Sequence, residues 1–235
     1  MTISTRDILW HCKTTLQDAG ATRWTLDELR RYINQATKQI ALQMPQATSI
    51  TKVMELGAGT YQELPEGESL LKAVRNITSA VGVTPRVSGK IVTAINLATL
   101  DSMYPNWHDD AKHPHTTTVT HVAMDPMTPR SFYVYPGNDG AGRIEVAVSV
   151  VPAEIDPPAD INDLDSYTTN IGLPPALGPV VMDYVLYRAF SKDSDKQASA
   201  ARAQAHYANY NSVLTNGMQT EAATGLAART TTPAG

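Results

Sequence analysis

The sequence of 235 residues contains 19 basic and 23 acidic side chains, which gives a formal net charge of −4 at pH 7. This balance excludes a protein that binds nucleic acid on its own, because phosphate neutralisation requires clustered lysine and arginine. The single Cys12 excludes an internal disulfide framework. No apolar run approaches the ~20 residues of a membrane span, and Asp7 lies where a signal peptide would begin its apolar core. We therefore expect a soluble intracellular protein.

The N-terminal region, residues 1–48, is predicted to form a helix pair. Apolar residues recur at helical spacing over residues 4–19 and again from Thr25 up to Pro45, which ends the second helix. Thr25 and Glu28 have the spacing of a capping box, in which each side chain satisfies a free backbone N–H. The short link between the two segments favours an antiparallel arrangement.

Residues 49–152 are predicted to form a β-rich lobe. Residues 50–56 and 61–65, joined by Gly57-Ala58-Gly59, indicate a hairpin. Strands are clearest further along the chain, where glycine and asparagine at 137–140 favour a turn between the last two. These strands are expected at residues 116–123, 131–135 and 143–151.

The remaining chain is divided into a linker, a helix pair and a tail. Residues 153–175 are acidic and rich in proline, without lysine or arginine, and are predicted to be a linker. Residues 176–217 are predicted to form a C-terminal helix pair that ends at Gly217, a typical C′ residue. Residues 218–235 are expected to form an extended tail, because they contain too few large apolar side chains to fold alone.

The predicted fold class is therefore α+β. Residues 1–48 and 176–217 are predicted to form a four-helix bundle, and the β-rich lobe is expected to project from this bundle. The last helix has small residues at every third or fourth position, which would let another helix approach closely. These positions are Ala198, Ala201, Ala205, Ala208 and Ser212.

Two groups of residues resemble metal sites without matching a known motif. Histidines and carboxylates gather in one stretch, but their spacing matches no zinc or iron motif. They are His108, Asp109, Asp110, His113, His115 and His121. The segment that begins at Asp160 starts like a calcium loop and lacks its central glycine and closing glutamate. We interpret both as polar loops, and the sequence predicts no metal, no cofactor and no catalytic residue.

Two other features favour contacts with proteins. Tyrosine is far commoner than phenylalanine, and Tyr184, Tyr187, Tyr207 and Tyr210 form i,i+3 pairs on the last two helices. Tyrosine favours surfaces that are half buried and half wet, as interfaces are, although an ordinary amphipathic core edge explains the pairs equally well. The tail composition suits a segment laid along a partner. Candidate subunit-packing residues are Ala201, Ala205, Tyr207, Ala208 and Tyr210, and candidate tail contacts are Met218, Thr220, Leu226 and Arg229.

Several segments in a fixed order resemble the head-to-tail adaptors of tailed phages that bind the portal. The most similar segment is residues 125–136, Asp-Pro-Met-Thr-Pro-Arg-Ser-Phe-Tyr-Val-Tyr-Pro. The others span most of the chain up to the end of the last helix. They are residues 24–29, 33–36, 70–76, 100–102, 105–108, 150–152 and 183–193.

The resemblance implies a non-enzymatic virion protein, assembled in the host cytoplasm and located in the phage neck. Such adaptors form a ring, typically of twelve copies, between the portal and the tail or nozzle protein. The ring extends the DNA channel, so that DNA is only a transient cargo and no membrane is involved. The resemblance also implies that the tail after Gly217 binds the portal.

Three alternatives remain open from the sequence. The first is a tail-completion or nozzle component, with the ring at another level of the neck. The second is a metal-dependent enzyme that uses the histidines between His108 and His121. The third is a small host-directed binding module, which would be monomeric and absent from particles.

Overall fold

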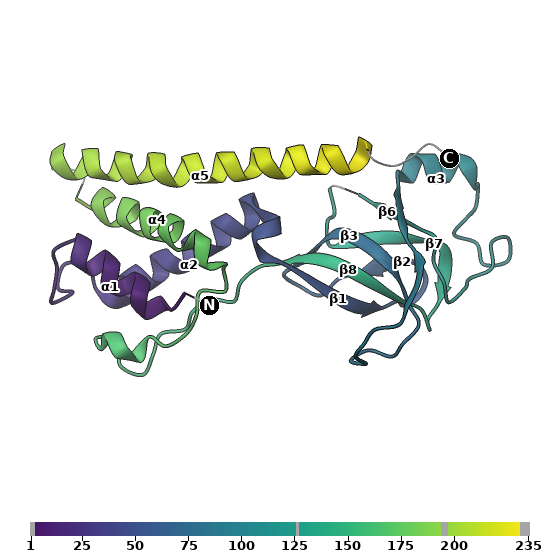
Figure 1. Ribbon diagram of the computed structural model, residues 1–235, viewed down its shortest axis with the longest axis horizontal. Coiled ribbons are helices and arrows are strands. Elements are labelled where there is room, and N and C mark those ends of the chain that lie inside the picture. Colours follow the sequence, from purple (N-terminus) through teal and green to yellow (C-terminus); the bar gives the residue numbers. More distant parts are fainter. Residues whose placement is uncertain (1–2, 126, 194–196, 231–235) are drawn as a thin grey trace. The chain divides into compact units, whose positions relative to one another are not determined.

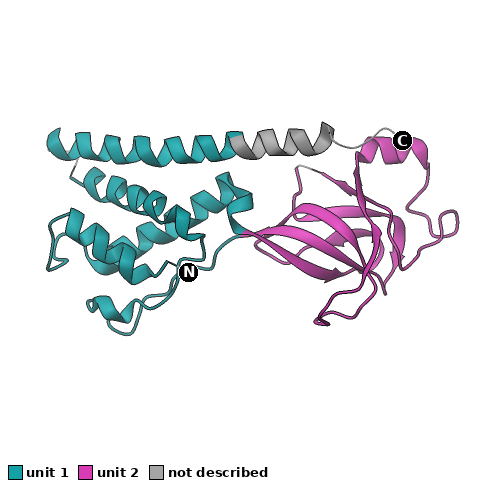
Figure 2. Ribbon diagram, in the orientation of Figure 1, with its two compact units in different colours: residues 1–48, 151–235 teal, residues 49–150 magenta. Residues whose placement is uncertain are grey.

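The computed structural model describes residues 3–125, 127–193 and 197–230, and for residues 220–230 it describes the backbone alone. The chain divides into two compact units (Figure 2). Unit 1, which is helical, combines residues 1–48 with residues 151–235, and unit 2, which contains the sheets, is residues 49–150. Unit 2 is thus an insertion within the sequence of unit 1, and the fold is α+β.

Helices α1 (Thr5–Thr15) and α2 (Leu26–Gln43) begin unit 1 (Figure 1). α2 begins as predicted, because Thr25 Oγ1 accepts a hydrogen bond from the Glu28 N–H at 3.2 Å. The Glu28 carboxylate accepts instead from Tyr32 and Lys192. The predicted apolar stripe of α2 is buried in full: Leu26, Leu29, Ile33, Ala36 and Ile40.

Helices α4 (Gly178–Ser191) and α5 (Gln197–Thr230) complete unit 1. α4 packs against α1, α2 and α5, and its apolar side chains occupy the middle of the single core of this unit. α5 lies along α4 in Figure 1 and contributes Ala203, Tyr210 and Leu214 to that core. The helices share one core, but a regular four-helix bundle is not confirmed.

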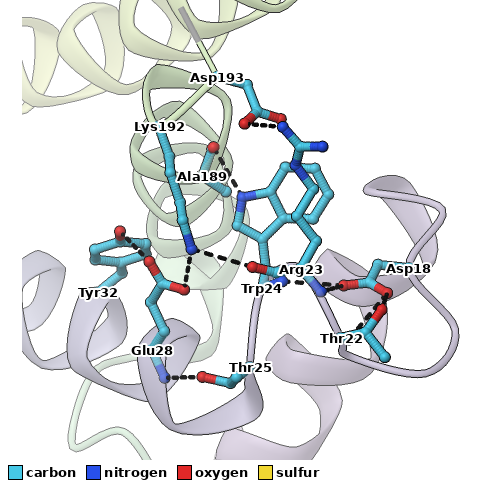
Figure 3. Close-up of polar contacts among 10 residues, drawn as sticks. All are labelled: Asp18, Thr22, Arg23, Trp24, Thr25, Glu28, Tyr32, Ala189, Lys192 and Asp193. Carbon is cyan, nitrogen blue, oxygen red and sulfur yellow. Dashed lines mark hydrogen bonds and ion pairs between the residues drawn. The ribbon is translucent and has the colours of Figure 1, made fainter.

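The loop between α1 and α2 is fastened to the end of α4 by polar contacts (Figure 3). The Asp18 carboxylate accepts hydrogen bonds from the backbone N–H groups of Thr22, Arg23 and Trp24. Burial alone would raise the pKa of Asp18, but these bonds stabilise the carboxylate and lower it. The buried indole of Trp24 donates to the Ala189 carbonyl at 3.0 Å, so the loop fixes both α2 and α4.

The segment predicted to be a linker packs against the helices of unit 1. Ile155, Tyr167, Ile171 and Leu173 are all buried in the helical core. The Asn34 side chain holds the start of the segment, because its amide donates to the Ile155 carbonyl at 3.1 Å and its oxygen accepts from the Ile155 N–H at 2.9 Å. These two bonds satisfy the backbone N–H and carbonyl of Ile155, which would otherwise be buried without the partners that a helix or a strand provides.

α5 continues past Gly217, where the sequence predicted a helix end, as far as Thr230. A helix interior tolerates one glycine at a cost of about 1 kcal/mol, and the space beside Gly217 is filled by the Met44 side chain. The extended tail is therefore not confirmed: residues 218–230 are helical, and residues 231–235 lie outside the described residues.

Gly217→Ala is expected to raise the free energy of unfolding by about 0.5–1 kcal/mol, because alanine favours the helix interior. The added Cβ would lie 2.4 Å from the end of the Met44 side chain, which is flexible enough to move. Urea unfolding would measure the change. Gly172→Ala is the control: Gly172 has φ +68°, so alanine there is strained and should destabilise the protein.

Unit 2 consists of two four-stranded sheets in the described residues. One sheet has the order β1-β8-β3-β4 and the other β2-β7-β6-β5. Side chains from both sheets share one hydrophobic core, so the sheets pack face to face. The strands are β1 (Ser49–Glu55), β2 (Ala58–Glu63), β3 (Glu68–Ile77), β4 (Ser88–Ile91), β5 (Thr93–Ile95), β6 (His121–Met124), β7 (Ser131–Asp139) and β8 (Arg143–Val150), with helix α3 (Leu97–Met103) between β5 and β6.

The predicted hairpin of residues 50–65 is wrong. β1 pairs with β8 and β2 pairs with β7, so Gly57 turns the chain from one sheet to the other. The Gln62 carboxamide accepts from the Gly57 N–H at 2.7 Å and donates to its carbonyl at 2.8 Å, which closes this corner. The predicted strand 116–123 is shorter, as β6, whereas the strands predicted at 131–135 and 143–151 are present as β7 and β8.

Candidate functional site

The predicted tyrosine pairs meet across α4 and α5. The ring centroids of Tyr184 and Tyr210 lie 5.1 Å apart, and those of Tyr187 and Tyr207 lie 4.9 Å apart. We call these four residues the tyrosine cluster. Tyr184 and Tyr210 are buried, and burial raises the pKa of Tyr210 to about 12. Tyr207 is 47% exposed, so the cluster is core at one end and surface at the other.

The exposed end of the tyrosine cluster borders a groove of about 460 Å³ between α2, α4 and α5. Leu42 of α2, which also lines this groove, is 73% exposed. Arg188 lies in the same groove, where its guanidinium donates to Gln35 and to the Tyr184 hydroxyl and lies over the Tyr32 ring. The groove thus combines aromatic, aliphatic and cationic surface, as protein interfaces do.

A second groove, of about 370 Å³, borders the other side of the exposed face of α2. Arg30 lies at its base and is buried; its guanidinium donates to the Asp27 carboxylate and to the Ile155 carbonyl. Burial alone would raise the pKa of Asp27, but the hydrogen bonds and charges of Arg30 and Arg31 outweigh it, so the pKa lies below its ordinary value. Lys38 pairs with Glu154 at the rim of this groove.

The small residues predicted for subunit packing are on the exposed face of α5. Ala201, Ala205 and Ala208 are exposed, together with Ala198 and Ser212. The opposite side of the same helix carries Ala203, Tyr210 and Leu214 into the core. Tyr210 is 3% exposed and belongs to the core of its own chain.

The residues predicted to bind the portal lie in the last turns of α5. Met218 is 40% exposed. Thr220, Leu226 and Arg229 are in the helical backbone, but their side chains lie outside the described residues. Leu214 is the last residue of α5 whose described side chain is fully buried.

Among the described residues, the histidines of unit 2 pack mainly against aromatic rings and do not form a group that could hold a metal ion. His108 packs on Trp107, with ring centroids 3.7 Å apart, and its Nδ1 lies 2.8 Å from the Thr60 hydroxyl. His121 stacks on Tyr135, and burial lowers its pKa. His113 lies at the edge of Tyr135, and His115 packs beside Gly137.

Neither metal binding nor thiol chemistry is supported by the described residues. Among the described residues, no group of three or more histidine, cysteine, aspartate or glutamate side chains could hold a metal ion. The same residues contain no helix long and apolar enough to cross a membrane. Cys12 is buried in the core of unit 1, and burial raises the pKa of its thiol to about 12, so it is unreactive at neutral pH.

The surfaces described above define an α+β protein whose distinctive features are helix faces suited to contacts with other proteins. A model of the SU10 adaptor protein family matches residues 6–233, and the chain belongs to this family of phage head-to-tail adaptors. None of the curated proteins matches the sequence.

Membership of this family indicates a structural role in the virion, at the connection between head and tail. The family is not known for enzymatic activity.

Proposed function

We propose that copies of this protein form a ring between the portal and the next tail or nozzle component and extend the channel through which DNA passes. The ring has twelve copies, as in adaptors of similar type, and lies in the phage neck. The helical unit builds the wall of the ring, and unit 2 meets the tail component. The negative net charge suits a channel wall, because a basic wall would bind DNA and slow its passage.

The observation that carries this proposal is the length of α5. The helix continues to Thr230, well beyond Leu214, the last of its described side chains that is fully buried. A helix end that leaves its own core is stabilised when it buries apolar surface against another protein. We assign portal binding to this end, through Met218, Thr220, Leu226 and Arg229.

The contacts between copies are assigned to the exposed face of α5 and to the exposed end of the tyrosine cluster. Ala201, Ala205 and Ala208 have no bulk that would keep a neighbouring helix away. Tyr207 offers an aromatic ring that is half exposed. Tyr210 is excluded from this set, because its side chain is buried in its own chain.

Removing residues 220–235 tests the portal contact. The shortened chain is expected to bind purified portal at least tenfold more weakly, a loss of about 1.4 kcal/mol or more. Its free energy of unfolding should be unchanged, because Leu214 and the core before it remain. Undiminished portal binding by a folded, shortened chain would refute the assignment.

A tail-completion or nozzle component is the second candidate, and portal binding separates the two. An adaptor binds purified portal directly, whereas a nozzle component binds only after another ring is in place. Mass spectrometry of purified particles gives the independent result, since both candidates are virion components and a host-directed binding module is not.

A further inference from the structure

The exposed face of α2 is basic, although the chain as a whole is acidic. Arg31 is exposed over 70% of its side chain, and Lys38 over 45%. Arg188 of α4 lies beside them, through its hydrogen bond to Gln35. We call the surface formed by Arg31, Lys38 and Arg188, together with the buried Arg30 that lines the second groove, the basic face; it lies between the two grooves described above.

Carboxylates of the same chain neutralise only part of the basic face. Arg30 and Arg31 share one partner, Asp27, and Lys38 pairs with Glu154. Within the described residues, Arg188 forms no ion pair; its partners are an amide and tyrosine rings. Four basic side chains therefore stand against two acidic ones. Arg30 is buried, and the accessible part of the surplus lies on Arg31 and Arg188, which line the two grooves.

An acidic surface with the opposite surplus lies in the segment before α4. The sequence contains no lysine or arginine from residue 144 to residue 187. Residues 156–165, which we call the acidic loop, expose Asp156, Asp160, Asp163 and Asp165. Only Asp165 has an ion pair in the described structure, with Arg6 of α1. Asp163 also lies close enough to Arg6 to interact with its charge, whereas Asp156 and Asp160 form no ion pair in the described residues.

We propose that the acidic loop of one copy docks on the basic face of the next copy in the ring. This proposal rests on the ring proposed above and adds a charged contact between neighbouring copies to the contact assigned to α5 and the tyrosine cluster. A ring requires heterologous contacts, in which one surface of each copy meets a different surface of its neighbour. The two surfaces are complementary in charge. The basic face lies on α2 and α4, and the acidic loop starts beside α2 at Ile155 and is tied to α1 through Arg6.

The internal contacts explain why the loop does not neutralise the basic face of its own chain. Ile155 is held against α2 by Asn34 and Arg30, and Glu154 is held by Lys38. Thr5 and Arg6 of α1 hold the other end, through Thr169 and Asp165. With both ends fixed, Asp156, Asp160 and Asp163 remain exposed. The carboxylates of Asp160 and Asp163 accept hydrogen bonds from the neighbouring residues Asn162, Asp165 and Ser166.

Charge reversal with rescue tests this contact. Arg31→Glu/Gln35→Glu reverses the basic face, and Asp156→Lys/Asp160→Lys reverses the acidic loop. Each double variant is expected to reduce the amount of the protein in purified phage particles by roughly tenfold or more, and to reduce by as much any oligomer that the isolated chain forms at low ionic strength. Combining all four substitutions is expected to restore most of both, because the opposite charges again face each other.

Matched controls separate this contact from general effects of charge. Lys90→Glu and Glu66→Lys make comparable changes on exposed residues of unit 2 and should leave incorporation unchanged. Urea unfolding of each variant shows whether it folds. If the wild-type chain is present in particles and the four-fold variant is incorporated no better than the double variants, the docking proposal is overturned while the adaptor role stands.

Three further outcomes also decide the question. Normal incorporation of either double variant overturns the docking proposal. Loss of DNA retention in particles whose ring is complete would assign the basic face to DNA phosphates, and would overturn it as well. Absence of the wild-type chain from particles would refute the adaptor role and the ring contact together.

Discussion

Asn34→Leu is expected to lower the free energy of unfolding by roughly 2–4 kcal/mol, although the two side chains are similar in size. Asn34 is buried, and its carboxamide forms both hydrogen bonds to the backbone of Ile155. Leucine would leave the buried Ile155 N–H without a partner, and that loss costs more than a hydrogen bond contributes. The Ile155 carbonyl would keep only its bond from Arg30.

Asn34→Leu should also loosen the structure locally, around Ile155, besides lowering the stability of the whole chain. Amide hydrogen exchange at Ile155, and proteolysis of residues 156–165, are expected to accelerate in Asn34→Leu. Gln204→Leu is the matched control, since Gln204 of α5 is exposed and should change stability by less than about 0.5 kcal/mol. An equal free energy of unfolding for wild type and Asn34→Leu would show that Asn34 does not hold the start of the acidic loop.

Asp27→Asn is expected to lower the free energy of unfolding by about 2–4 kcal/mol at neutral pH. The substitution removes the carboxylate partner of the buried Arg30 guanidinium, and breaking a buried ion pair from one side is costly. Arg30 keeps its bond to the Ile155 carbonyl, which limits the loss. Urea unfolding at pH 7 measures the difference.

The same variant gives a pH dependence with a definite sign. The pKa of Asp27 lies below its ordinary value of 3.8 in the folded chain, so its stabilising contribution is complete above pH 3.8 and is lost as the pH falls through the lower, folded pKa. The difference between wild type and Asp27→Asn should therefore shrink in acid. Asp7→Asn is the control, because Asp7 is exposed and weakly paired; a constant difference across pH would contradict the prediction.

The helices of unit 1 could be predicted because their signals are local. The apolar stripe of α2 and the Thr25 cap depend on residues within one or two turns of each other, and both are present in the structure. The segment 153–175 was harder, since its buried residues are separated by exposed aspartates and prolines. Asn34 carried no recognisable signal, because a polar residue in an amphipathic helix is ordinarily exposed.

The pairing of the strands could not be predicted from local patterns. Residues 50–65 have the alternation and the glycines of a hairpin, yet the partner of β1 is β8, nearly a hundred positions further along the chain. Gly57 does lie at a turn, as predicted, but a turn glycine is equally compatible with a corner between two sheets and with a hairpin. Only the long-range register decides between them.

The small residues of α5 illustrate the reverse problem. Their spacing correctly indicates a face without bulky side chains, but spacing alone does not say what covers it. In the structure this face is exposed, and the opposite face, with Ala203, Tyr210 and Leu214, packs against α4. The tyrosine pairs were ambiguous for the same reason, and two of their members are core residues.

The inserted position of unit 2 has a consequence for how such proteins diversify. Its first and last strands are neighbours, with Ser49 directly opposite Ser149, so the chain enters and leaves the sheets at adjacent points. A module with closely spaced ends can be exchanged for another without altering the host framework. Recombination can thus replace unit 2 by a different domain while the helical unit 1 stays the same, for example when a phage lineage acquires a different tail.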